Sequence, residues 1–236
     1  MSEPYRADNL LDRVGDAHTR QVHYDQEMRR ERAILARGLP LRGGDVLSVG
    51  CGWHPGRHLF PRPAFRMTGV DLDPAMIDSL VESGELDDGT AGRAGELSYA
   101  PGSFDVVLYR LVLHHVVYQG PLGPVFEEAA RLLRPGGALV AVEPGLWHPV
   151  GLGLAVANSV GLGPVTHGTP DDIPLSPRVL TREARSAGLR PELHAVTYGW
   201  RRLSAPAQRA LHALDSVGSR PRLAPLGHTL MMIARG

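Results

Sequence analysis

Short apolar runs alternate with longer segments of mixed polarity along most of this chain. Four of the runs are continuous and rich in β-branched residues, and helix-length segments separate them. These runs are 45–49, 65–70, 104–108 and 138–142. Buried parallel strands joined by helical crossovers produce this pattern, because helices cover both faces of such a sheet. The pattern therefore predicts an α/β fold with a mostly parallel sheet.

The segments around these runs carry helix start and stop signals. Asp73 and Pro74 suit the N-cap and first position of a helix over 75–83. Further helices are expected at 17–38, 122–133 and about 177–187, and further strands at 193–198 and 229–234. Three stretches carry no such signal: a loop at 84–95, an irregular apolar segment after Glu143, and a polar stretch before the last strand. No internal repeat is present, which indicates one domain over 1–236.

Length, charge and cysteine content narrow the class of protein. A chain of 236 residues suits one well-cored domain. Its 25 basic and 25 acidic residues cancel, which argues against a nucleic-acid partner. All basic residues are arginine, which excludes lysine chemistry of the Schiff-base or phosphate-loop kind. The single cysteine, Cys51, excludes an internal disulfide and any zinc spacing, so we predict no metal.

Targeting signals are missing from the sequence pattern. The first residues are polar and do not show a basic segment followed by an apolar one. The longest apolar stretch, 146–165, is interrupted by histidine, proline, asparagine, serine and several glycines, which disfavours a membrane span. We therefore expect a cytoplasmic protein without a membrane partner.

Two glycines close the first apolar run, and an acid closes the second. Gly50 and Gly52 would let the backbone approach a ligand that side chains would block. Asp71, about 20 residues further on, is placed to bind both hydroxyls of a ribose. Alone, a glycine pair is more often a tight turn, and Asp71 alone could cap a helix. In combination they favour an adenosine-type cofactor.

Four stretches, taken together and in this order, resemble the class I S-adenosylmethionine (SAM)-dependent methyltransferases. They are VLSVGCG, GVDLDPAMI, GSFDVVLYRLVLHHV and EEAARLLRPGGALVAVEP, and they span about residues 45–144. The resemblance implies a Rossmann-like, seven-stranded, mostly parallel sheet with helices on both faces. It also implies a small cover, built from an N-terminal helical segment over residues 1–40 and an insertion at 145–175. The implied cofactor is SAM, with S-adenosylhomocysteine as product.

The same resemblance implies a set of cofactor-binding residues. Gly50, Cys51 and Gly52 would cradle the methionine end, Asp71 would bind the ribose, and Leu72 would lie beside the adenine. Arg93 and Ala94 would also lie near the adenine, Tyr109 and Arg110 would form the floor near the sulfonium, and Tyr24 would close over the carboxylate. On the residues alone, Tyr24 is more often a packing residue and Cys51 is expected to be buried and inert.

Three positions depart from the family pattern. Ser48 stands where an acid is common, and Trp53-His54 is a two-residue insertion after the glycines. Arg93 stands where an aspartate usually accepts a hydrogen bond from the adenine, and a guanidinium has only donors. Arg93 could stack on the base instead. These departures bear on the strength of cofactor binding more than on the fold.

The chemistry requires an acceptor atom held in line with the methyl group and the leaving sulfur. A base is needed only if the acceptor must lose a proton, and the candidate catalytic residues are His115, Glu143 and His148. His115 could instead be a structural residue, and Glu143 could cap the segment that follows it. His167 could belong to a plain turn.

The most concrete interpretation is methyl transfer to a small molecule in a biosynthetic pathway, with oxygen as the first choice of acceptor atom. The apolar composition of 145–168 favours a partly apolar acceptor, and a homodimer is a further hypothesis. A second interpretation is a SAM-binding protein that transfers no methyl group, acting as a non-redox cyclase or a regulatory subunit. A dinucleotide-dependent oxidoreductase is disfavoured, because the spacing GxGxxG is missing after the first strand.

Overall fold

The computed structural model describes residues 17–166, 174–217 and 221–236. A seven-stranded sheet forms its centre, with strand order β3-β2-β1-β4-β5-β7-β6. The strands are β1 (Gly44–Val49), β2 (Phe65–Asp71), β3 (Asp88–Ala91), β4 (Phe104–Arg110), β5 (Leu133–Pro144), β6 (Arg190–Thr197) and β7 (Thr229–Arg235). Only β7 runs antiparallel to its neighbours, β5 and β6. The predicted Rossmann-like, mostly parallel, seven-stranded sheet is therefore confirmed.

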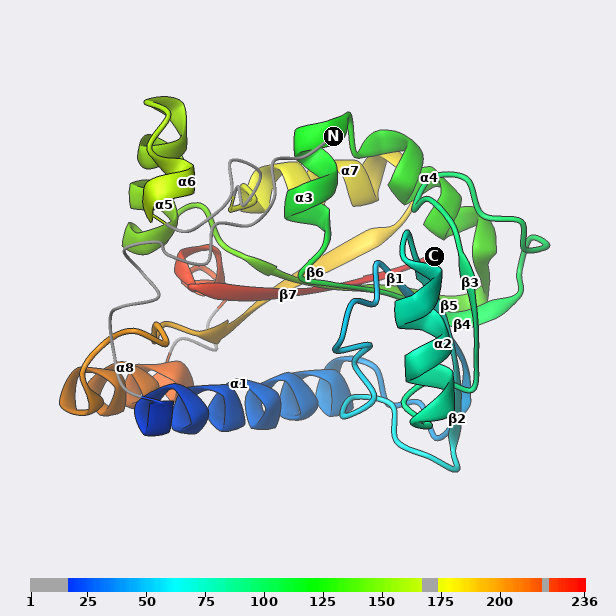
Figure 1. Ribbon diagram of the computed structural model, residues 1–236, viewed down its shortest axis with the longest axis horizontal. Helices are drawn as coiled ribbons and strands as arrows, with labels where there is room; N and C mark the ends of the chain where they lie inside the picture. Colours follow the sequence, from blue (N-terminus) through cyan, green and yellow to red (C-terminus); the bar gives the residue numbers. More distant parts are fainter. Residues whose placement is uncertain (1–16, 167–173, 218–220) are drawn as a thin grey trace.

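Helices cover both faces of the sheet (Figure 1). One face carries α1 (Ala17–Gly38), α2 (Pro74–Glu82) and α8 (Ala205–Val217), and the other carries α3 (Leu113–Gln119), α4 (Gly123–Leu132) and α7 (Pro177–Ser186). Two short helices, α5 (Pro149–Ser159) and α6 (Gly163–Thr166), project together from one end of the molecule, and the 3-10 turn η2 (Ala224–Leu226) precedes β7. Among the helices that the structure describes, none has the length and apolar character needed to cross a membrane.

The strands alternate between two apolar cores. In β4, Val107 and Tyr109 pack with α3, α4 and α7, whereas Val106 and Leu108 pack with α1 and α2. Side chains of a strand point to opposite faces in turn, so a strand with apolar residues at every position is buried on both sides. Because of this alternation, successive residues at the end of β4 point to opposite faces of the sheet.

Several elements differ from the sequence expectation. The segment 84–95 contains the edge strand β3, which has no apolar run and is held by backbone pairing to β2. The irregular segment after Glu143 contains α5 and α6, and the polar stretch before the last strand contains α8. Helix α3 directly follows β4 and was also not predicted. The segments expected at the other strands and helices are confirmed to within a few residues.

Candidate active site

A cleft of about 620 Å³ lies at the carboxyl edge of β1, β2 and β4. This is where ligands bind in open α/β sheets, and the volume is within the usual range for small-molecule sites. Seven of the residues that the sequence nominated line it: Gly50, Gly52, Asp71, Leu72, Arg93, Ala94 and His115. The opposite wall is formed mainly by α3 and the start of α4, through residues such as Leu111, Val112, Val116, Gln119 and Val125.

The glycine turn after β1 requires its glycines for conformational and steric reasons. Gly50 has φ +61° and Gly52 has φ +46°, the left-handed region that side chains disfavour. A Cβ atom at Gly50 would also collide with the side chain of Val112. Both glycines line the cleft, so its wall at this turn is bare backbone.

Asp71 ends β2 with its carboxylate held by backbone amides. Its Oδ2 accepts a hydrogen bond from the Gly52 amide at 2.9 Å, and its Oδ1 accepts from the amides of Leu72 at 2.7 Å and Asp73 at 3.3 Å. A carboxylate offers about four acceptor sites, so roughly one remains, on Oδ2. The carboxylate lines the cleft and can still accept a hydrogen bond there.

Two exposed leucines give the cleft apolar walls. Leu72 is 61% exposed and Leu111 is 46% exposed, although both side chains are large and aliphatic. Leu111 has φ +57°, which makes it the one non-glycine residue with positive φ among those the structure describes. This conformation is unfavourable for a leucine, and it turns the chain from β4 into α3. The residue with positive φ at this turn is a leucine and not a glycine, so the sequence does not indicate the turn.

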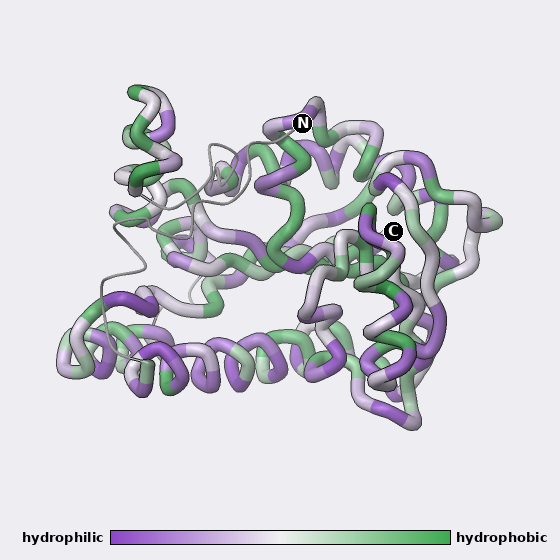
Figure 2. Tube along the Cα trace, in the orientation of Figure 1, coloured by the Kyte–Doolittle hydropathy of each residue, from purple (hydrophilic) through white to green (hydrophobic). Residues whose placement is uncertain are grey.

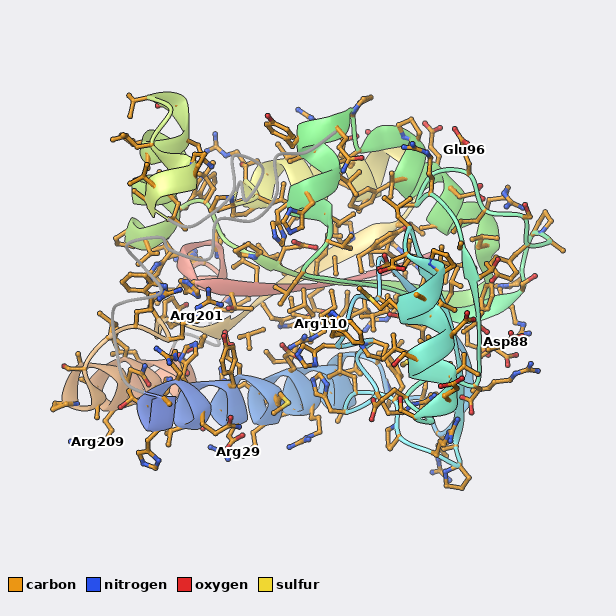
Figure 3. The ribbon with its side chains drawn as sticks, viewed as in Figure 1. Arg29, Asp88, Glu96, Arg110, Arg201 and Arg209 are labelled. Carbon is orange, nitrogen blue, oxygen red and sulfur yellow. The ribbon has the colours of Figure 1, made fainter. Side chains whose placement is uncertain are left out.

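The structure does not bring the side chains of Tyr109 and Arg110 into the cleft. Tyr109 is fully buried, and its hydroxyl donates to the carbonyl of Val125 at 3.2 Å. Arg110 points to the α1 face, where its guanidinium binds the buried Glu31 at 3.1 Å (Figure 3). Strand alternation sends these two side chains to opposite cores, and Leu111, one residue later, occupies the cleft wall in their place.

Glu143 lies at the end of β5, with a carboxylate that is fully buried. It accepts hydrogen bonds from the amides of Val112 at 3.0 Å and Leu113 at 2.8 Å, at the start of α3. Its Oε2 lies 2.6 Å from Nδ1 of His114. The ring of His114 is in turn 4.1 Å from the ring of His115, which lines the cleft. Glu143 therefore caps α3 and also places its carboxylate against the histidine pair.

His148 and Tyr24 lie outside the cleft lining. His148 is the N-cap of α5: its Nδ1 accepts from the Val150 amide at 3.2 Å, so its Nε2 carries the proton toward the Tyr198 carbonyl. Burial lowers the pKa of His148. Tyr24 on α1 accepts a hydrogen bond from Arg201 at 3.0 Å. His167 lies outside the described residues.

The departures from the family pattern have local explanations. Ser48 is buried, and its hydroxyl donates to the Pro55 carbonyl at 2.9 Å, which anchors the loop that contains the inserted Trp53. Trp53 itself is 63% exposed. The exposed Arg93 lines the cleft, and its carbonyl accepts from the Glu96 amide at 3.1 Å. Among the described residues, no group of three or more His, Cys, Asp or Glu side chains is arranged to hold a metal ion.

Cys51 lies between the two glycines and is buried. Burial, and after it the charge of Asp71, raises the pKa of the Cys51 thiol to about 12. Because the thiolate is the reactive form, we expect iodoacetamide at neutral pH to leave the native protein unmodified. Mass spectrometry should show one alkylated cysteine only after denaturation. Rapid alkylation of the native protein would contradict this assignment.

A doubly wound sheet with a glycine turn and a carboxylate at its carboxyl edge is typical of proteins that bind an adenosine-type cofactor. Residues 47–141 match the family model described as a methyltransferase domain. A 27-O-demethylrifamycin SV methyltransferase from Amycolatopsis mediterranei (strain S699) is 30% identical over 203 residues, covering 78% of this chain and 71% of that protein. The chain therefore belongs to the class I SAM-dependent methyltransferases, and its methyl donor is SAM.

Of two further comparisons, one covers less of the chain and the other is less identical in sequence. A human thiol S-methyltransferase is 33% identical over 144 residues, which covers 54% of this chain and 57% of that protein. A SAM-dependent methyltransferase from Thermotoga maritima, described as a possible histamine N-methyltransferase, superposes with a TM-score of 0.63. That structure is 14% identical, and the match covers 92% of this chain and 91% of the other. The structural likeness shows the fold alone.

Proposed function

We propose that this enzyme methylates an oxygen atom of a small, partly apolar metabolite. The rifamycin enzyme, whose name refers to an oxygen, matches 78% of this chain, whereas the thiol S-methyltransferase matches 54%. The longer match includes many residues outside 45–144, the region that resembles the cofactor-binding part of the family. In our interpretation, acceptor specificity resides in these other residues. This difference in extent favours oxygen over sulfur.

The segment after β5 supports a partly apolar acceptor. Five aliphatic side chains of α5, α6 and their connection are between 40% and 63% exposed: Leu152, Val156, Val160, Leu162 and Val165. No charged residue occurs over 149–166, and Figure 2 shows this segment as largely hydrophobic or neutral. Exposed apolar patches of this kind commonly mark ligand or partner sites. We retain 145–175 as the proposed acceptor cover, together with the N-terminal segment over residues 1–40.

The cleft fits SAM on chemical grounds. In this proposal the backbone at Gly50 and Gly52 receives its methionine end, the remaining acceptor site of Asp71 binds a ribose hydroxyl, and Leu72 and Leu111 pack against its apolar surfaces. Arg93 and Ala94 flank the adenine. When bound, SAM supplies a methyl group on a positively charged sulfur. The contribution of the chain is then to position the acceptor and to exclude water.

We propose that His115 removes the acceptor proton, with His114 and Glu143 as positioning residues. His115 lines the cleft, and the hydrogen bond to Glu143 places the Nδ1 proton of His114 toward that carboxylate. The ring of His114, held by Glu143, packs 4.1 Å from the ring of His115 and so fixes the orientation of the cleft histidine. This chain of contacts from a buried carboxylate to a cleft histidine is the observation on which the proposed mechanism rests.

The acceptor atom can be tested with a chemically graded panel. Purified enzyme and SAM would be incubated with aliphatic alcohols, phenols, thiols and amines built on similar apolar skeletons. We expect S-adenosylhomocysteine to form with hydroxylated members, and mass spectrometry with fragmentation to place the methyl group on oxygen. Turnover with thiols or amines alone would contradict the oxygen assignment and leave the enzyme class unchanged.

Replacing His115 is expected to affect turnover rather than cofactor binding. His115→Asn removes the proton acceptor, so kcat should fall about 100-fold, as is typical of a lost general base. His114→Asn keeps a donor toward Glu143 and should reduce kcat less. Calorimetry should show S-adenosylhomocysteine affinity within about twofold of the original protein for both variants.

The control for this pair is His18→Gln, which changes an exposed histidine at the start of α1. It should leave kcat unchanged. Full activity of His115→Asn would show that proximity alone, without a base, accounts for the catalysis.

A further inference from the structure

A second cavity, of about 320 Å³, lies between the second half of α1 and the sheet edge formed by β6 and β7. It is separate from the cleft and shares no lining residue with it. Its charged and titratable lining comes from three elements: Arg30 and Arg37 of α1, Glu192 and His194 of β6, and Arg235 of β7. Neither the methyl-transfer chemistry nor the proposed acceptor site uses these residues.

The lining carries a local excess of positive charge. Three guanidinium groups and one carboxylate line the cavity. Arg30 donates to the carbonyls of Val196 at 3.1 Å and Asp215 at 2.6 Å, and its charge is partly balanced by Asp215. Guanidinium groups stay charged at all ordinary pH values and offer five donors each. The nearest approach of Glu192 to Arg235 is 3.9 Å, so this carboxylate neutralises the group only partly. An anion would balance the remaining charge.

Some of the arginine hydrogen bonding is structural. Arg37 donates from Nε to the Ala33 carbonyl one turn earlier at 3.1 Å, and Arg235 donates to the Gly38 carbonyl, which lies at the end of α1. The two terminal nitrogens of Arg37 have no hydrogen-bond partner among the described residues. The guanidinium of Arg37 is therefore held in place by its Nε and can still bind a ligand with its terminal nitrogens.

His194 provides an independent sign that a partner is missing. Its Nε2 atom is shielded from solvent and has no hydrogen bond among the described residues, although it lies 3.5 Å from Glu192. Buried polar groups are almost always hydrogen-bonded. Burial, together with the charges of Arg37 and Arg235, lowers the pKa of His194 against the opposing effect of Glu192. An anion in the cavity would supply an acceptor and would favour the protonated ring.

We propose that this cavity binds a small tetrahedral oxyanion, namely phosphate or the phosphate group of a small monoester. Arginine is suited to such ligands, because its planar group forms paired, charge-assisted hydrogen bonds to their oxygens. Arg37 and His194 contact the oxyanion, and Arg30 and Arg235 add positive charge. Inorganic phosphate and a phosphate monoester share this chemistry, and direct comparison distinguishes them.

The test is calorimetric titration of the full chain, without SAM, using inorganic phosphate, glycerol phosphate and sulfate at constant ionic strength. We expect saturable binding, and a loss of affinity of about tenfold in Arg37→Gln, because a charged donor pair is removed. The matched control is Arg29→Gln. Arg29 lies on the same helix, is exposed, and points away from the sheet toward solvent, where it donates to Gln26 (Figure 3).

A second variant tests the role of His194. Sulfate keeps its charge over the pH range of histidine titration, so its affinity should rise in the original protein as the pH is lowered from about 7.5 to 6, and stay level in His194→Gln. Heats no different from those of sodium chloride, or equal losses in Arg29→Gln and Arg37→Gln, would overturn the proposal. Tighter binding of glycerol phosphate than of phosphate would identify a monoester as the ligand. Failure of this test would leave the proposed methyl transfer untouched.

Discussion

Asp71→Ala is expected to weaken S-adenosylhomocysteine binding by about 10- to 100-fold, equivalent to roughly 1–3 kcal/mol. The variant removes the carboxylate that we propose binds a ribose hydroxyl. It also leaves the amides of Gly52 and Leu72 without their acceptor, so the glycine turn loses a support at the same time. Two losses at one residue make this the largest effect that we expect on the cofactor.

Calorimetry with purified protein would measure this change, with S-adenosylhomocysteine as the ligand because it does not turn over. Asp73→Ala is the matched control. Asp73 lies two residues away and caps α2, accepting from the amides of Ala75 at 3.0 Å and Met76 at 3.4 Å. Its loss should cost about 1 kcal/mol of stability without a comparable loss of affinity.

The possible results distinguish a direct contact between Asp71 and the ligand from an indirect effect through the backbone. An unchanged affinity in Asp71→Ala would refute the ribose assignment. Equal losses of affinity in the two variants would indicate that the local backbone, rather than the carboxylate, determines binding. Asp71→Asn keeps one acceptor oxygen and should fall between the original protein and the alanine variant.

The central sheet could be predicted because its strands carry the information themselves. β1, β4 and β5 each contain a short run of consecutive buried residues, because helices cover both faces of the sheet. The edge strand β3 has the sequence Asp-Gly-Thr-Ala and is stabilised by its pairing with β2, which a local pattern does not record. Helix α8 was also missed, although Pro206 in its first turn is a residue that commonly starts helices.

The cleft could be predicted only where backbone geometry leaves a mark on the sequence. Gly50 and Gly52 are visible because positive φ selects glycine. Leu111 has positive φ without being glycine, and was missed for that reason. The partnership of Glu143 with His114 depends on the ends of β5 and β4 lying side by side, about 30 residues apart in the chain. The sequence identifies Glu143 as a candidate functional residue, but it does not distinguish a helix-capping role from a catalytic one.

Four histidines from separate parts of the chain lie close together near the start of β7, and no local sequence pattern predicts this cluster. Nδ1 of His23 on α1 lies 3.3 Å from Nε2 of His212 on α8, and the ring of His148 lies 5.1 Å from that of His228. His228 directly precedes β7, so this cluster joins α1, α8, the N-cap of α5 and the sheet. Protonation of these rings would place like charges close together.

The cluster should make the protein sensitive to mild acid. Burial lowers the pKa of His228 to about 3, and it also lowers the pKa values of His148 and His212. In the unfolded chain each histidine has a pKa of about 6.5. Below this value the unfolded state binds protons that the folded state does not, so stability is complete above pH 6.5 and falls as the pH decreases toward 3. For His228 alone, the loss between pH 7 and about 4.5 is on the order of 2 kcal/mol.

Two buried acids limit the pH range over which the change in stability reports on the histidines. Burial disfavours the charge of Glu27, but the hydrogen bond and charge of His23 outweigh that cost and leave the pKa of Glu27 at about 2. Its contribution to stability is lost only below an ordinary glutamate pKa of about 4.5. Burial raises the pKa of Asp215, so this acid favours the folded state as the pH falls, with the opposite sign to Glu27. The interval from about pH 7 to 4.5 therefore reports mainly on the histidines.

Urea unfolding at several pH values in this interval would measure the effect, and His228→Gln would test its origin. The variant carries no titrating group at this position, so it should lose less stability than the original protein as the pH is lowered, even if it is less stable at neutral pH. His18→Gln, which alters an exposed histidine, should retain the full pH dependence. A stability that does not change with pH, or the same decrease in His228→Gln, would show that the folded protein accommodates protonated His228. An equal decrease in His228→Gln would assign the acid sensitivity to other titrating groups.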